Sequence, residues 1–159
     1  MPTNPSTTSF HATPLVVVED SDEDFDTFVQ AAREAGVTQT IRRVASGGDC
    51  LALLRGEPVD GLVPLSTLPL VILMDLNSHG VDGREALVAI KSEARLKEIP
   101  VVVLTTSTNP KDVAFCYHAG ANAYHVKPVR HDHYLLLLQS LLHYWLANVT
   151  QPCTVVKVN

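Results

Sequence analysis

Cysteine is scarce in this chain and is not arranged for cross-linking. The three cysteines, Cys50, Cys116 and Cys153, lie far apart and form no CxxC pair. A disulfide framework needs an even set of cysteines at regular spacings, and a zinc site needs closely spaced ligand pairs. Neither is predicted, and we expect a reducing, cytoplasmic location.

Clusters of basic residues and long apolar runs are also absent. The formal net charge is −5, whereas domains that hold nucleic-acid phosphates carry a basic face. The most apolar segment, 134–146, is interrupted by Gln139, Ser140 and His143, and it is shorter than the roughly 20 residues that a membrane span needs. We therefore expect no nucleic-acid partner and no membrane segment.

The length of 159 residues suits one domain with a single core. Residues 1–13 are rich in Thr, Ser and Pro and lack the basic start and apolar stretch of a signal peptide, so we expect a disordered lead. The domain is expected over 14–148. The tail, 149–159, has a strand-like composition, which suits either an arm that reaches a partner subunit or a frayed end.

Short apolar runs alternate with helical patterns along the chain. The expected strands cover 14–20, 40–45, 69–75, 99–105 and 123–126. The expected helices cover 21–36, 47–56, 83–93, 109–120 and 131–147. Strands and helices in strict alternation indicate an α/β fold, with a parallel sheet covered by helices on both faces.

Polar residues stand at the carboxyl ends of four expected strands. Glu19 and Asp20 follow the first, Asp75 the third, Thr105 the fourth and Lys127 the fifth. Taken singly these residues have plainer explanations, as helix caps, structural groups or a turn. Together they meet at one edge of the sheet, where ligands bind in such folds. Three crowded carboxylates favour Mg²⁺, and a lysine with a hydroxyl suits anionic oxygens, so the group indicates a phosphoryl site that contains an aspartate.

Four segments resemble the successive motifs of the receiver domain of two-component response regulators. They are "VVVEDSDED", "VILMDLNSHGVDGREAL", "PVVVLTTST" and "ANAYHVKP". The resemblance spans roughly residues 14 to 147. Within the family the chain is most similar to the stand-alone regulators of bacterial and cyanobacterial phytochrome kinases, which share the "MDLN" motif, the long stretch before the third strand and the "HYWL" ending.

The resemblance implies a flavodoxin-like (βα)5 sandwich of three layers, with five strands in the order 2-1-3-4-5. It also implies that Asp75 accepts a phosphoryl group from a phosphohistidine of a partner histidine kinase, for which a phytochrome is expected. Mg²⁺ would be bound by Asp20, Asp75 and the main-chain carbonyl of Asn77, with Glu19 acting through water.

The same resemblance gives roles to three more residues. Thr105 and Lys127 would each bind one phosphoryl oxygen, and Tyr124 matches the aromatic switch that turns inward when Thr105 moves. The bond between Lys127 and Pro128 matches one that is usually cis in the family, a form that is accessible before proline.

The expected output is contact with other proteins, because the residues after Lys127 suffice for one helix and a tail. Beyond self-catalysed phosphorylation and autodephosphorylation, no enzyme activity is expected. The helices at 109–120 and 131–147 have more apolar surface than one buried face requires, which favours a homodimer through them. The expected interface residues are Val113, Tyr117, Tyr124, Leu138 and Trp145.

One alternative stays open at this point, and a second is disfavoured. Ser78, His79 and Gly80 depart from the small or apolar residue, proline and glycine usual in the family, which would suit a degenerate receiver that serves as a constitutive binding module. A flavodoxin-like cofactor binder would need a phosphate loop rich in Ser, Thr and Gly after the first strand. The segment "EDSDED" is its electrostatic opposite, so this alternative is disfavoured.

Overall fold

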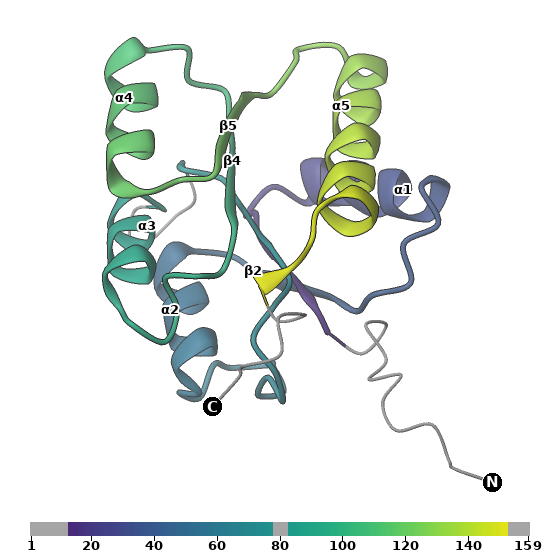
Figure 1. Ribbon diagram of the computed structural model, residues 1–159. Coiled ribbons are helices and arrows are strands. Elements are labelled where there is room, and N and C mark those ends of the chain that lie inside the picture. The colour runs from purple at the N-terminus through teal and green to yellow at the C-terminus, as the bar shows by residue number, and fades with distance from the viewer. Residues whose placement is uncertain (1–12, 78–82, 153–159) are drawn as a thin grey trace, which may run out of the picture.

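A five-stranded parallel sheet forms the centre of the protein (Figure 1). The computed structural model describes residues 13–77 and 83–152. Its strands run in the order β2-β1-β3-β4-β5, which confirms the predicted fold class and topology. They are β1 (Leu15–Val18), β2 (Ile41–Val44), β3 (Ile72–Met74), β4 (Val101–Thr105) and β5 (Ala123–Val126).

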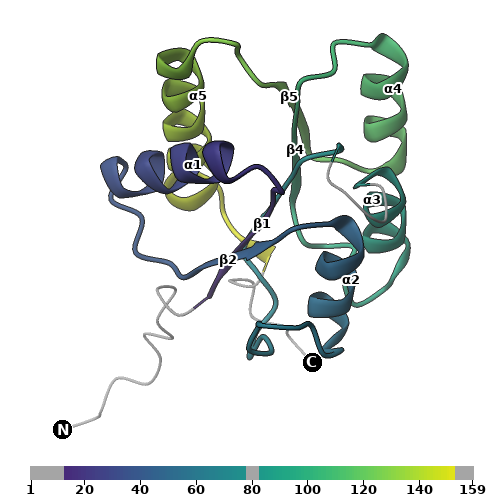
Figure 2. The same cartoon turned by 180° about the vertical axis from the view of Figure 1, so that it is seen from behind.

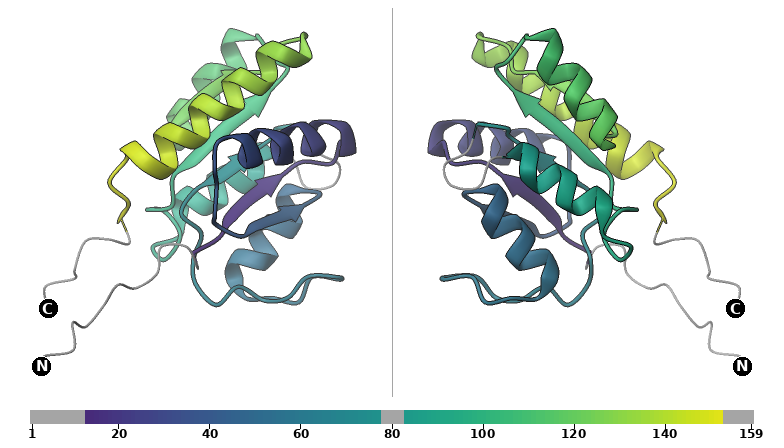
Figure 3. Two further views of the ribbon diagram at one scale, coloured as in Figure 1. Left: turned by 90° about the vertical axis from the view of Figure 1, so that its right-hand side faces the viewer. Right: turned by 90° about the vertical axis from the view of Figure 1, so that its left-hand side faces the viewer.

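Helices cover both faces of the sheet, as Figures 1 and 2 show from opposite sides. Figure 3 shows α1 and α5 covering one face, while α2, α3 and α4 cover the other. The helices are α1 (Asp22–Glu34), α2 (Gly47–Arg55), α3 (Gly83–Ser92), α4 (Pro110–Ala119) and α5 (His131–His143), followed by the π-helical turn η2 (Tyr144–Asn148).

The three inner strands are apolar apart from Thr105 at the end of β4, because each strand is covered on both faces. In β1, Val16 and Val18 pack into the core under α2 and α3, and Leu15 and Val17 pack into the core under α1 and α5. The edge strands β2 and β5 have half-buried polar residues such as Arg43. A parallel strand that is buried on both faces has a continuous apolar sequence. The inner strands therefore gave the strongest strand signals in the sequence.

Capping residues set the helix starts near the predicted positions. The Ser21 hydroxyl accepts a hydrogen bond of 3.2 Å from the main-chain N–H of Asp24 at the start of α1. Asn109 caps α4 by accepting from the main-chain N–H of Lys111 at 3.0 Å, and Gly120 ends this helix at a φ of 106°, where glycine is favoured. These contacts satisfy main-chain groups that a helix leaves unpaired at its ends.

The end of α5 differs from the prediction of one α-helix through residue 147. The α-helix ends at His143 and a π-helical turn follows. There the N–H of Val149 donates to the carbonyl of Tyr144 at 2.9 Å, a bond that spans five residues and is the mark of π-helical geometry. The helical path still places Trp145 against the core under α1 and α5.

Some predictions fall on residues that lie outside the described ranges. These are most of the 1–13 lead, the last seven positions of the 149–159 tail, and the Ser78, His79 and Gly80 segment. Within residues 13–77 and 83–152, no helix has the length and apolar character needed to cross a bilayer.

Candidate functional site

The residues predicted from the strand ends do meet at the carboxyl edge of the sheet. Glu19, Asp75, Thr105 and Lys127 are all buried, with exposed fractions of 5%, 8%, 0% and 8%. Charged groups are rarely buried unless they are paired. The contacts of these four residues therefore determine what the site can do.

Lys127 is the centre of the site. Its ammonium donates to Glu19 Oε2 at 2.7 Å, to Asp24 Oδ2 at 2.8 Å and to Asp75 Oδ2 at 2.9 Å. Burial by itself lowers the pKa of Lys127, but the hydrogen bonds to the three carboxylates outweigh it and raise the pKa above its ordinary value. The side chain is therefore a permanent cation with all three of its N–H donors in use.

Glu19 balances burial against the lysine. Burial raises the pKa of this carboxyl, the hydrogen bond and the charge of Lys127 lower it, and the net result is a raised pKa. Its second oxygen accepts the main-chain N–H of Ser21 at 3.1 Å. The main-chain carbonyl of Glu19 accepts a hydrogen bond from Arg43 Nε of β2 at 2.9 Å. This contact helps to fix the position of Glu19 after β1.

Both carboxylate oxygens of Asp75 are held. Oδ2 contacts Lys127, and Oδ1 accepts the main-chain N–H of Asn77 at 2.9 Å. Behind it, α3 begins very close to this turn. A Cβ placed on Gly83 would lie 2.8 Å from the Asp75 carbonyl oxygen and 2.9 Å from Leu76 Cα, so only glycine fits there.

Three carboxylates lie close enough to share a cation. Glu19, Asp20 and Asp75 each present an oxygen, and these oxygens lie within 4.8 Å of one another. Hard divalent cations prefer such oxygen ligands. The residues therefore fit the metal that the sequence predicted. Asn77, the fourth predicted ligand residue, lies at the same turn, where its side-chain amide donates to Thr105 Oγ1 at 3.1 Å.

Thr105 and Tyr124 meet through Ser107. The Thr105 hydroxyl accepts the main-chain N–H of Ser107 at 3.3 Å, and the Tyr124 hydroxyl donates to the Ser107 carbonyl at 2.9 Å. Burial raises the pKa of Tyr124, so the phenol keeps the proton that it donates. The Tyr124 main-chain N–H also donates to Tyr117 Oη at 3.2 Å, which joins this strand to α4.

Ser107 also connects the site to two helices. Its hydroxyl donates to Asp112 Oδ2 of α4 at 2.5 Å, and Arg84 of α3 pairs with Asp112 Oδ1 at 2.9 Å. The hydrogen bonds from Ser107 and Arg84 lower the pKa of Asp112. A movement of Thr105 would therefore reach α3, α4 and β5 through one residue.

The sequence interpretation missed Asp24 and Ser107. Asp24 was assigned only to the start of α1, yet it lies one helical turn beyond Asp20 and shares Lys127 with Glu19 and Asp75. Its position four residues after Asp20 could have indicated that its carboxylate lies near the site. Ser107 gave no signal, because its main-chain N–H and carbonyl make its bonds to Thr105 and Tyr124, and the residue type does not determine main-chain contacts.

Two predictions need correction. No cis peptide bond occurs in the part of the chain that the structure describes, so the bond between Lys127 and Pro128 is trans, which is the more stable form even before proline. Leu138 was expected in a dimer interface, but its side chain is completely buried in the core under α1 and α5. It has no surface to offer to a partner.

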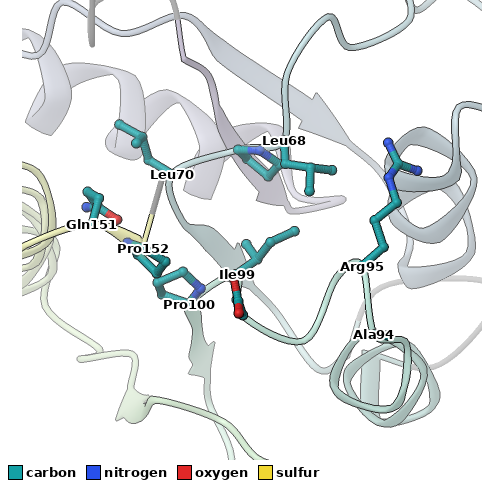
Figure 4. Close-up of a pocket in the computed structure, with 10 residues that line it drawn as sticks. Leu68, Leu70, Ala94, Arg95, Ile99, Pro100, Gln151 and Pro152 are labelled. Carbon is teal, nitrogen blue, oxygen red and sulfur yellow. The ribbon is translucent and has the colours of Figure 1, made fainter. Parts of the chain in front are cut away.

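A large cavity among the described residues is remote from the site. It measures about 610 Å³ and lies at the opposite edge of the sheet, beside the segments that enter β3 and β4 (Figure 4). Its wall includes Leu70, Pro100 and Pro152. Beside Asp75 and Asp24, by contrast, the cavity measures only about 10 Å³.

Comparison with known proteins gives one consistent result. The profile of the response regulator receiver domain matches residues 15–139. The chain is 34% identical over 132 residues to the probable methanogenesis regulatory protein FilR2 of Methanothrix harundinacea, covering 83% of each chain. It is also 34% identical to the response regulator Rcp1 of Synechocystis, covering 87% of this chain and 92% of Rcp1.

Solved structures agree with the sequence relatives. The phosphorylated cyanobacterial phytochrome response regulator RcpA superposes with a TM-score of 0.81 at 33% identity, covering 89% of this chain and 99% of RcpA. The Mn²⁺-bound form of Rcp1 gives the same TM-score and identity, and the match covers 88% of this chain and 99% of that one.

Proposed function

This chain belongs to the response regulator receiver family, and we propose that it accepts a phosphoryl group on Asp75 from a histidine kinase. Receiver domains are signalling proteins rather than enzymes. The observation that carries the proposal is the position of Asp75 itself, whose carboxylate lies beside the Lys127 ammonium, at 2.9 Å, and within the group of three acids.

The chemistry follows from that position. An Asp75 carboxylate oxygen attacks the phosphorus atom of a phosphohistidine, and a P–O bond forms while the P–N bond breaks. The imidazole leaves with the electron pair of that bond. Lys127 and Thr105 supply an ammonium and a hydroxyl to the charged oxygens of the phosphoryl group. Both are already placed before the reaction, because they are buried at neighbouring strand ends.

Mg²⁺ is the proposed cofactor. Asp20, Asp75 and the main-chain carbonyl of Asn77 would hold it, with Glu19 acting through a water molecule. When bound, it would offset the negative charge of the acids and of the incoming phosphoryl group. The three carboxylates within 4.8 Å support this proposal, as does the existence of an Mn²⁺-bound form of Rcp1.

Tyr124 is proposed as the switch that reports phosphorylation. When Thr105 turns toward the phosphoryl group, its hydroxyl would leave the Ser107 N–H that it accepts at 3.3 Å. The Ser107 carbonyl, which holds the Tyr124 hydroxyl, would shift with it. The signal would then leave through the surface formed by α4, β5 and α5.

The test of phosphorylation is direct. The protein is incubated with acetyl phosphate and Mg²⁺ and weighed by mass spectrometry. We expect wild type to gain one acid-labile phosphoryl group and Asp75→Asn to gain none, while Asp26→Asn, which changes an exposed acid of α1, labels like wild type. Labelling of Asp75→Asn would refute the assignment. An unlabelled wild type would instead favour a constitutive binding module.

The proposed kinase is a phytochrome. The support is the similarity to RcpA, a phytochrome response regulator. Mixing the chain with a phosphorylated phytochrome kinase of its own organism should move the phosphoryl group to Asp75 faster than mixing with an unrelated histidine kinase. Equal rates would contradict the pairing.

A homodimer through the outer faces of α4, β5 and α5 is also proposed. The surface there is rich in exposed apolar groups, since Tyr117 is 51%, Val126 40% and Leu136 61% exposed. Val113 and Tyr124 are half-buried beside them, and Trp145 is half-buried against the core. A two-fold dimer would cover this face, and two-fold symmetry is the commonest among soluble oligomers.

Sedimentation with and without phosphodonor tests this assembly. We expect wild type to dimerise at tens of micromolar, roughly the range in which weak dimers are seen, and Tyr117→Asp to remain monomeric. Val88→Asp is the matched control, because Val88 is 43% exposed on α3, outside the proposed face. A monomeric wild type under both conditions would refute the dimer, and a dimeric Tyr117→Asp would place its interface elsewhere.

A further inference from the structure

Asp24 is the one partner of Lys127 that belongs neither to the group of three acids nor to the phosphoacceptor. Its Oδ2 lies 2.8 Å from Lys127 Nζ, as close as the bonds from Glu19 and Asp75. Its main-chain N–H is bound to the Ser21 hydroxyl, so the first turn of α1 fixes where its carboxylate stands. The side chain is 33% exposed, which places it between the buried lysine and solvent.

The donors of Lys127 are fully used in this state. An ammonium has three N–H groups, and Glu19, Asp24 and Asp75 each accept one. A phosphoryl oxygen on Asp75 can reach Lys127 by taking the place that the Asp75 oxygen holds now. The bond to Asp24 needs no change during this exchange, so its carboxylate stays beside the ammonium before and after transfer.

We propose that Asp24 is a positioning residue for phosphoryl transfer, which holds Lys127 from the side of α1 and offsets part of its charge. The inference rests on the proposed function of Asp75. A fixed carboxylate beside the ammonium weakens the attraction between the site and an arriving anion, because its negative charge repels the anion and offsets part of the attraction to Lys127. Asp24 thereby limits how tightly the site binds the phosphoryl group.

Asp24→Asn isolates this effect. The change keeps the shape and removes the charge, and Glu19 and Asp75 continue to hold Lys127. The first measurement is the affinity for beryllofluoride, a phosphoryl mimic, in the presence of Mg²⁺. The second is the labelling rate as a function of acetyl phosphate concentration, which separates the half-saturating concentration from the maximal rate.

We expect Asp24→Asn to bind beryllofluoride about threefold to tenfold more tightly than wild type, as suits the loss of one partly screened charge. The half-saturating concentration of acetyl phosphate should fall by a similar factor. The maximal rate should stay within about twofold, because the groups that touch the reacting atoms are unchanged. A residue that only stabilised α1 would alter thermal stability and leave the half-saturating concentration where it was.

Asp26→Asn is the matched control, because it removes the same charge from an exposed position on the same helix. We expect its affinity to equal that of wild type. If Asp24→Asn does not fold, Asp24→Ser, which also removes the charge, is measured in the same way. Equal or weaker binding by the Asp24 variant, or an equal gain in Asp26→Asn, would overturn the inference alone. Wild type that neither binds beryllofluoride nor accepts label would overturn it together with the proposed function.

Discussion

Replacing Lys127 with methionine is expected to lower the free energy of unfolding strongly. The substitution keeps an unbranched side chain of similar length and removes the ammonium. Glu19 and Asp75 are then left buried and uncompensated, at exposed fractions of 5% and 8%. Asp24 loses a partner as well, but its side chain is 33% exposed and water can take that place.

The expected cost is about 3–5 kcal/mol, the range for breaking a buried ion pair by removing one partner. The free energy of unfolding of a domain is typically about 5–15 kcal/mol, so the loss would be large. Urea denaturation of both proteins at pH 7 in a chelating buffer measures it. A second variant, Lys127→Arg, retains the charge and should lose less stability than Lys127→Met.

The pH dependence gives an independent check of the cause. In wild type, burial already raises the pKa of Glu19 above its ordinary value of 4.5, although Lys127 lowers it. Without the lysine this pKa must rise further. A folded state with a raised carboxyl pKa keeps a proton that the unfolded state has lost, so stability falls as pH rises from about 4.5 through the raised value. The deficit of Lys127→Met should therefore shrink on acidification.

Metal provides the converse test. A cation bound by Glu19, Asp20 and Asp75 would supply the charge that Lys127→Met lacks, so Mg²⁺ should stabilise the variant more than wild type. If Lys127→Met lowers the free energy of unfolding at pH 7 by less than about 1 kcal/mol, the loss is below the range for breaking a buried ion pair. That result would refute the role given to Lys127. A deficit that is the same at pH 5 and pH 7 would refute its attribution to Glu19.

Three further predictions concern separate parts of the molecule. Gly83→Ala should cost about 1–3 kcal/mol, as overpacking does, and should slow phosphorylation, because its Cβ would lie 2.8 Å from the Asp75 carbonyl oxygen; a thermal melt and a labelling rate that both match wild type would contradict this. Asp20→Ala should keep the fold by circular dichroism but lose Mg²⁺ binding by calorimetry, and normal labelling in chelator would show that the metal proposal is wrong. The Cys50 thiol is buried and its pKa is raised by burial to about 12, so thiol reagents should modify it slowly in the native protein and rapidly in urea; rapid native modification would contradict the packing of α2.

The sheet and the strand-end residues could be predicted because their signals are local. An inner parallel strand must be apolar on both faces, and a polar residue at its end stands out against such a run. β1, β3 and β4 gave this signal, and Glu19, Asp75 and Thr105 were found through it, whereas Lys127 follows the half-buried edge strand β5. β5 has the predicted bounds and the other four strands are shorter than predicted, with β3 and β4 shortened mainly at their amino-terminal ends, away from the site.

The partners of these residues could not be predicted, because side-chain direction depends on how each helix is turned against the sheet. Leu138 lies in a run of four leucines, and periodicity alone does not say which of them faces inward. Packing of α5 against α1 turns Leu138 into the core and leaves Leu136 61% exposed. Asp24 was overlooked for a related reason, since its place in the first turn of α1 already had a sufficient local explanation.

Charge balance gives the site its requirement for a cation. Four carboxylates, from Glu19, Asp20, Asp24 and Asp75, gather at one edge of the sheet, and Lys127 pairs with three of them. One positive charge leaves an excess of negative charge at the place where an anionic phosphoryl group must arrive. A divalent cation held by the three clustered acids removes most of that excess, whereas Lys127 alone does not. The same charge balance distinguishes two of the three partners of Lys127 in variants. Neutralising Asp24 should favour anion binding without affecting the metal, while neutralising Glu19 should alter the binding of both.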